Sequence, residues 1–202
     1  MKQRSAGFTL IEMMFTVLIL GTLLVLGVPG LRDFFRNSRM TAAANDLLAD
    51  INIARTESIK RRVPVTVCAS AAPLAASPAC AAKDATSFTG WFVFVDHNGD
   101  HVVSGAIAGP PAFPADVIIR RHELLPTGTT AKADMGFISF ADSGFLRAIG
   151  SDASATRVVI CDGRGNVDVG SGRSAGRAVT ISPTGRAGVT RTVTAITGLG
   201  GC

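Results

Sequence analysis

Residues 7–31 read GFTLIEMMFTVLILGTLLVLGVPGL, and this stretch decides how the chain is built. The 24 residues from Phe8 to Leu31 carry a single charge, on Glu12, and the next charged residue is Arg32. As a helix the stretch is roughly 36 Å long, enough to cross a hydrocarbon core of about 30 Å. The sequence therefore predicts one membrane-spanning segment. A charged residue within such a segment is costly, so the position of Glu12 near its start needs a functional explanation.

Basic residues flank both ends of this segment, so their count does not orient it. They are Lys2 and Arg4 before it, and Arg32, Arg36 and Arg39 after it. The apolar stretch is too long for the core of a secretory signal, contains an acid and is not followed by a clear small-residue cleavage site. Cleavage after the stretch is therefore disfavoured, and cleavage before it, after Gly7, is the alternative.

The N-terminal sequence MKQRSAGFTLIEMMFTVLILGTLLVLGVPGL resembles the class III leader and N-terminal helix of type IV pilins and type II secretion pseudopilins. The resemblance implies that a prepilin peptidase cleaves between Gly7 and Phe8 and that Phe8 is N-methylated. Cleavage lowers the formal charge from +5 to about +3, because Lys2 and Arg4 are removed. The new amino group on Phe8 of a neighbouring subunit is then a partner for Glu12, since opposite charges attract strongly at low dielectric. The alternative is a carboxylate that reaches the membrane surface from one end of the span.

Apolar periodicity continues beyond the span and predicts a second, amphipathic part of the same helix. One face carries Ala44, Leu47, Leu48, Ile51, Ala54 and Ser58. The helix is expected to end by Arg62, because Val63 precedes Pro64 and is disfavoured in the α conformation. A single helix from about Phe8 to Arg62 would be roughly 80 Å long. Pro29 predicts a bend in it, and the resemblance to pilins implies bending or melting at this point. The alternative is that the span ends near Pro29.

After Pro64 the pattern changes to short strands separated by turn residues, which predicts an α+β fold with antiparallel strands on the helix. The expected strands are 65–68, 91–95, 117–121, 136–140, 158–161 and 178–182, with 189–194 a weaker candidate. No second helix is expected. The alanine-rich segment ASAAPLAASPACAAKDA, which contains Pro73 and Pro78, is expected to be a surface loop held by Cys80.

Four cysteines lie outside the span: Cys68, Cys80, Cys161 and Cys202. They show no zinc-binding spacing, so in a membrane-anchored chain they predict two disulfides formed in the periplasm. Of the three pairings we favour Cys68–Cys80 with Cys161–Cys202. Buried free thiols are the alternative.

The segment DHNGDH, residues 96–101, spaces its acids like the start of a calcium loop. A calcium loop would need glycine at His101 and an acid at Ile107, so we expect a polar hairpin turn at Asn98–Gly99 and no metal. His97, His101 and His122 are not accompanied by a hydrolase motif. We therefore expect neither an enzyme nor a cofactor.

No acid follows Asp168, whereas four arginines do, and these are the candidate DNA-binding residues: Arg173, Arg177, Arg186 and Arg191. Solubility and protection of a strand edge are the simpler interpretation. No aromatic residue follows Phe145, so contact with DNA would involve the phosphate backbone and be sensitive to salt.

The order of LLADINIARTESIKRRVPVTVC, GWFVFVDHNGD, ISFADSGF, VVICDGRG and GRAVTISPTGR resembles the FimT/GspH group of minor pilins and pseudopilins. In the FimT branch some members bind DNA through Gly-Arg-x-Arg, but here Gly188 follows Gly185–Arg186 where the second arginine is required. The resemblance implies a type IV pilin-like fold with a leader (1–7), a filament-core helix (8–31), a helical spine (32–63) and a β-rich periplasmic domain (64–202).

The resemblance also implies a function. The predicted role is a minor pilin in type IV pilus assembly, anchored once in the bacterial inner membrane. The alternatives are a type II secretion pseudopilin and a DNA-binding minor pilin for natural transformation. The expected partners are other pilins or pseudopilins, the prepilin peptidase, the inner membrane and, for the last alternative, DNA.

Overall fold

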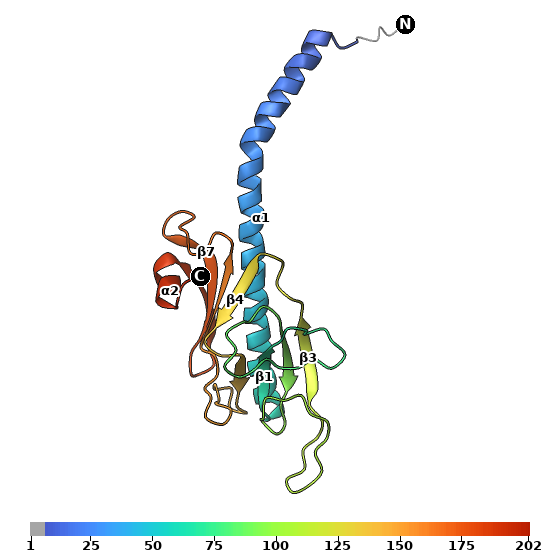
Figure 1. The fold of residues 1–202 in the computed structure, drawn as a ribbon, viewed down its shortest axis with the longest axis vertical. Coiled ribbons are helices and arrows are strands. Elements are labelled where there is room, and N and C mark those ends of the chain that lie inside the picture. The colour runs from blue at the N-terminus through green and yellow to red at the C-terminus, as the bar shows by residue number, and fades with distance from the viewer. Residues whose placement is uncertain (1–6) are drawn as a thin grey trace. The chain divides into compact units, whose positions relative to one another are not determined.

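The computed structural model describes residues 7–202, apart from the side chain of Pro29, and is shown in Figure 1. Lys2 and Arg4 of the predicted leader lie outside the described residues. The chain forms two compact units, Met1–Arg39 and Met40–Cys202, and we describe each by itself. One element, helix α1 (Leu10–Arg61), supplies residues to both.

Helix α1 confirms the long helix expected from the sequence, and it is unbroken at Pro29. By length and composition it can cross a membrane. The helix ends where the sequence predicts, because Arg62 takes the left-handed conformation with a φ of 57° directly before Val63 and Pro64. No melted turn interrupts the assigned helix.

The domain formed by Met40–Cys202 consists of two four-stranded antiparallel sheets and the second half of α1 (Figure 1). The first sheet has the order β3-β2-β1-β5, from β1 (Val65–Ala69), β2 (Trp91–Val95), β3 (Val117–His122) and β5 (Phe137–Phe140). The second has the order β4-β6-β7-β8, from β4 (Thr129–Ala133), β6 (Arg157–Asp162), β7 (Arg173–Ile181) and β8 (Ala187–Thr192). This architecture confirms the predicted α+β class.

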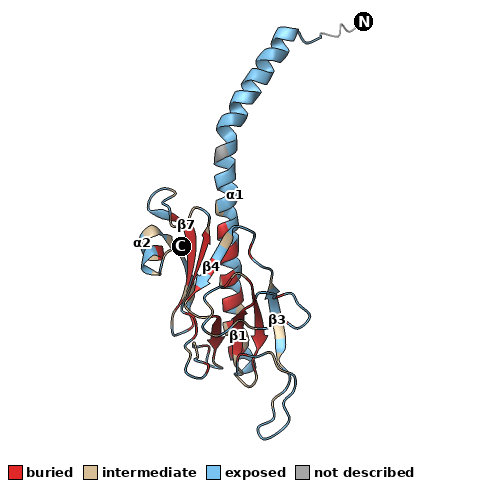
Figure 2. Cartoon of the chain, viewed as in Figure 1, coloured by how far each residue is buried: buried red, intermediate tan, exposed pale blue. Residues whose placement is uncertain are grey.

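One core joins the helix to both sheets, as the buried residues in Figure 2 indicate. The helix contributes the predicted apolar face, in which Ala44, Leu47, Ile51, Ala54 and Ser58 are fully buried and Leu48 is half-buried. Strands β1 and β2 are buried along their whole length, so side chains on both of their faces are shielded from water. Apolar burial of this kind stabilises the domain by roughly 25 cal/mol for each Å² removed from water.

Two elements were not predicted. Strand β4 has the sequence TTAKA, whose small and polar side chains give no apolar alternation; its pairing with β6 and the burial of Ala131 hold it in place. Helix α2 (Val193–Gly198) contradicts the expectation of no second helix. Its β-branched residues favour a strand, but Thr192 accepts a hydrogen bond from the amide of Ala195, and Ile196 is buried against Val159 and Ala178.

The predicted hairpin at Asn98–Gly99 is also wrong in part. A turn forms there, with Gly99 at a φ of 71°, but β3 begins only at Val117. The buried Asp96 carboxylate holds the turn by accepting hydrogen bonds from the amides of Asp100 (3.1 Å) and His101 (3.2 Å). The buried Asp116 accepts from the amides of His97 (2.9 Å) and Ser104 (2.8 Å), which closes the longer connection.

A buried carboxylate on α1 fastens the helix to the first sheet. Asp50 is 1% exposed and accepts a hydrogen bond from the indole N–H of Trp91 at 2.9 Å. The Nε of Arg120 on β3 lies 2.7 Å from the other carboxylate oxygen, as an ion pair rather than an aligned hydrogen bond. The ring of His122 stacks on Trp91 with centroids 3.8 Å apart and lies near Asp46, one turn before Asp50. The apolar stripe alone does not predict this polar contact.

Replacing Asp50 with alanine tests its contribution. Asp50→Ala leaves a buried indole N–H without an acceptor and Arg120 without its counter-ion, so we expect the free energy of unfolding to fall by about 3 kcal/mol. Asp46→Ala, at a position with a 58% exposed side chain, is the matched control and should cost less than about 1 kcal/mol. Urea unfolding of the full chain in detergent reports both, because Trp91 is the only tryptophan. Equal costs would refute the proposed contribution of Asp50.

Candidate functional sites

The first half of α1 exposes a continuous apolar surface. Side chains from Leu10 to Leu26 that are large and apolar are all at least 54% exposed. Keeping such a surface in water is unfavourable in proportion to its area. We therefore expect lipid or other helices to cover the apolar surface of this half of the helix.

Glu12 lies in the first turn of α1, where a negative charge is favourable next to the free amides of the helix N-terminus. Its own amide donates a hydrogen bond to the Oγ1 of Thr9 at 3.3 Å, so Thr9 caps the helix. Within residues 7–202 no cation forms an ion pair with the Glu12 carboxylate. None of these residues therefore competes with the predicted partner of Glu12, an amino group from another subunit.

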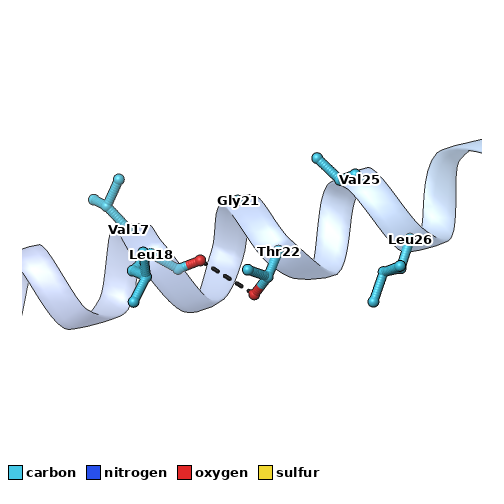
Figure 3. Close-up of a pocket in the computed structure, with 6 residues that line it drawn as sticks. All are labelled: Val17, Leu18, Gly21, Thr22, Val25 and Leu26. Atoms are coloured by element: carbon cyan, nitrogen blue, oxygen red, sulfur yellow. Dashed lines mark hydrogen bonds between the residues drawn. The ribbon is translucent and has the colours of Figure 1, made fainter.

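A groove on α1 surrounds Gly21, and Figure 3 shows how its side chains diverge around the glycine. Its volume is about 520 Å³, and its lining residues are Val17, Leu18, Gly21, Thr22, Val25 and Leu26. The Thr22 hydroxyl donates to the carbonyls of Leu18 (3.2 Å) and Ile19 (2.8 Å), which satisfies its polar group within the helix. The groove therefore offers an apolar surface with open space above Gly21.

The cysteines form the two disulfides favoured from the sequence, Cys68–Cys80 and Cys161–Cys202. The second joins the segment after α2 to β6. The Nε2 of His101 lies 3.5 Å from the Sγ of Cys68, which gathers two sulfurs and an imidazole within 4.8 Å. Both sulfurs are bonded to each other, so neither is a free thiolate for a metal.

His101 is buried against the ring of Phe137, with ring centroids 5.0 Å apart. Burial, with a smaller effect from Lys83, lowers the pKa of His101 to about 4. The imidazole is therefore neutral at neutral pH. Burial raises the pKa of the nearby Asp96.

The four arginines proposed to contact DNA do not form one surface. Arg186 is exposed on the turn between β7 and β8, and its neighbour Gly185 lies beside Arg55 of α1. Arg173 is exposed at the opposite end of β7, and Arg191 is half-buried on β8.

Arg177 is 2% exposed and has a structural role that the sequence did not suggest. Its Nη1 donates to the carbonyls of Ser174 (3.0 Å), Ala175 (3.1 Å) and Gly176 (2.8 Å). Burial and then the charges of Arg191 and Arg164 lower the pKa of Arg177. The inward direction of the Arg177 side chain depends on the fold, and the local sequence carries no signal for it.

Comparison with known proteins gives two family matches. Residues 43–194 match the family described as Type II transport protein GspH, and residues 2–28 match the prokaryotic N-terminal methylation motif. No curated protein matches the chain.

Among solved structures, two crystal forms of the type IV minor pilin FimU from Pseudomonas aeruginosa are similar. The form in space group P21 has 22% sequence identity and a TM-score of 0.47, over 78% of this chain and 92% of that one. The form in space group P65 has 21% identity and a TM-score of 0.43, over 74% of this chain and 91% of that one.

The buried histidine predicts a pH dependence of stability. Unfolded His101 titrates near 6.5 and folded His101 at about 4, so between these values the unfolded state binds the additional proton. Stability from this group is complete above pH 6.5 and falls towards pH 4, by up to about 3 kcal/mol. Asp96 acts with the opposite sign, because its raised pKa favours the protonated folded state.

Comparing the wild-type chain with His101→Asn isolates the contribution of the histidine to the pH dependence. Asparagine is a suitable replacement because it tolerates the φ of 73° at this position. Urea unfolding measured at several values of pH should show a smaller loss of stability on acidification in the variant. Identical slopes for the two chains would mean that His101 is not buried as a neutral group.

Proposed function

The chain belongs to the GspH family of type II transport proteins, and on this basis we propose that it is a minor pilin that enters a type IV pilus. The observation that carries the proposal is a helix with an exposed apolar surface and, in its first turn, an acid that pairs with no cation of the described residues. Such a helix is suited to leave the membrane for a bundle of similar helices, where each apolar surface is covered. The role is structural and uses no catalytic residue.

In this proposal, cleavage between Gly7 and Phe8 creates the group that Glu12 requires. The methylation motif over residues 2–28 supports processing at this point. The free amine of Phe8 on a neighbouring subunit then pairs with Glu12, and the pair sets the axial register of two helices. An incoming helix in the wrong register leaves both charges unpaired in a medium where that is costly.

A type II secretion pseudopilin is the second candidate, and membership of a family of type II transport proteins favours it. The same helix and the same acid serve both roles. Deletion of the gene separates them: loss of surface pili indicates the pilus, and loss of secreted enzymes with normal pili indicates the secretion system.

A DNA-uptake role stays a prediction. Two features of the structure weigh against the original set of four arginines: Arg177 is engaged by backbone carbonyls, and Arg186 lies at the far end of β7 from Arg173. Arg173 and Arg191 are the members of that set that share one end of the sheet.

Glu12→Gln tests the pairing, because it removes the charge with little change in shape. We expect normal membrane insertion and normal cleavage, with incorporation into the filament reduced at least about tenfold. Immunoblots of sheared filaments and of membranes from the same cells measure the two pools. Met13→Leu, at the next position, is the control and should be incorporated normally. Normal incorporation of Glu12→Gln would contradict the pairing.

Gly21→Leu tests whether the groove accepts another helix. A Cβ added at Gly21 meets no atom within 4 Å, and leucine suits a lipid environment, so folding and insertion should be unaffected. It fills the groove, so filament incorporation should fall several-fold if a neighbouring helix lies there. Gly27→Leu makes the same change outside the groove and should have a smaller effect. Equal incorporation of both variants would show that the groove is not a contact.

A further inference from the structure

An irregularity in the second sheet gathers arginines at one end of the domain. Strands β7 and β8 pair Arg173 with Thr192 and then Ala178 with Thr190. Four residues, Ser174–Arg177, therefore lie opposite the single residue Arg191. This is a wider bulge than the usual two residues against one.

The Arg177 side chain fills this bulge through its bonds to the three bulged carbonyls. The register places Arg173 beside Thr192, next to Arg191, and Gly165 and Gly176, the neighbours of Arg164 and Arg177, both lie beside Cys202. In keeping with this placement, burial and then the charges of Arg191 and Arg164 lower the pKa of Arg177, against an opposing effect of Asp162. We call these four residues, Arg164, Arg173, Arg177 and Arg191, the arginine cluster.

Neighbouring acids leave part of the cluster's charge without a partner. Asp162 is engaged by Arg164, with Nη2 at 2.6 Å and Nε at 3.0 Å from Oδ2. Asp168 accepts from the amides of Gly170 (2.7 Å) and Gly172 (3.1 Å). In the described part of the chain, neither Arg173 nor Arg191 forms an ion pair, and the buried Nε of Arg191 has no hydrogen-bond partner.

The fold places this cluster at the start of the buried part of α1. The Nη2 of Arg177 donates to the Oγ1 of Thr41 at 3.3 Å, and Met40 is the first buried residue of the helix. Ten residues lead from Leu31, the end of the apolar stretch, to Thr41, which is a rise of about 15 Å along a helix. The intervening sequence RDFFRNSRM adds three arginines and one aspartate. Chain connectivity thus limits how far the cluster lies from the membrane surface.

We propose that the arginine cluster binds the phosphate groups of anionic phospholipids and holds the domain at the membrane surface before the chain enters a filament. Arginine suits this ligand because its guanidinium donates two parallel hydrogen bonds to phosphate oxygens. Basic residues next to a membrane span each gain about 1 kcal/mol from an anionic surface. The inference rests on the proposed function only in requiring the apolar stretch to lie in a membrane.

Lipid is favoured over DNA as the ligand by three features. The cluster is tethered close to a bilayer, no aromatic residue after Phe145 can stack on bases, and the exposed Arg186 lies at the other end of β7. The expected consequence is that incorporation into a filament must first release these contacts.

The experiment uses the full chain in nanodiscs of phosphatidylcholine alone or mixed with phosphatidylglycerol. Val167, 55% exposed between β6 and β7, is changed to cysteine and labelled with a fluorophore; the four native cysteines are paired, so the new thiol reacts alone. Energy transfer to a headgroup-labelled lipid reports how close the domain lies to the surface. We expect higher transfer in phosphatidylglycerol discs and loss of this difference at high salt.

Single substitutions assign the effect to the cluster. Arg173→Gln and Arg191→Gln should each lower the equilibrium constant for docking on phosphatidylglycerol discs, obtained from the transfer, about fivefold. Arg186→Gln removes the same charge from the opposite end of β7 and should leave it unchanged. Arg173 is exposed, so Arg173→Gln still tests the proposal if Arg191→Gln unfolds, which Trp91 fluorescence detects.

Three results would overturn the proposal. Transfer from the folded chain could be the same in both lipids; Arg186→Gln could act as strongly as Arg173→Gln, which would indicate net charge alone. Duplex DNA added to phosphatidylcholine discs could instead bind through Arg173 while phosphatidylglycerol has no effect. The assay needs no filament, so its failure leaves the pilin role standing, and failure of that role leaves the assay valid.

Discussion

A carboxylate in the first turn of an apolar helix is the constraint on which the rest of the molecule depends. Among residues 7–202 no cation pairs with Glu12, and the large apolar side chains that follow it on the helix are exposed. A charge in such surroundings is tolerated only when a partner neutralises it. The chain therefore behaves as an incomplete structure, whose missing parts are an amine and apolar helices supplied by other subunits.

The fold of the domain also depends on helix α1. Its core includes the apolar face of α1 from Met40 onward, and Asp50 adds a directional contact to Trp91 and Arg120. Apolar burial alone would permit the helix to slide or rotate against the sheets, whereas a buried carboxylate with two partners favours one position. A force that displaces the part of α1 after Met40 therefore also acts on the first sheet, through the contact of Asp50 with Trp91 and Arg120.

Much of this architecture follows from sequence pattern. Apolar periodicity identified the helix, and the Val63–Pro64 pair identified its end by Arg62; β-branched and aromatic runs identified β1, β2 and β6. Pattern failed where tertiary contacts outweigh local preference: TTAKA is a strand because β6 pairs with it, and VTAITG is a helix because Thr192 caps it and Ile196 is buried. The arginines show the same limit. The sequence suggested one group of four, whereas in the fold Arg177 is buried in the β7 bulge and Arg173 and Arg186 are exposed at opposite ends of β7.

Treatment of intact filaments with a zero-length carbodiimide cross-linker, followed by mass spectrometry of the N-terminal peptides, tests the proposed joint most directly. We expect an amide bond between the Glu12 carboxyl group and the N-terminal amino group of a neighbouring subunit, and a mature chain that begins at an N-methylated Phe8. A chain that still begins at Met1, one that begins beyond Pro29, or a Glu12 that never cross-links in filaments containing the protein would contradict it.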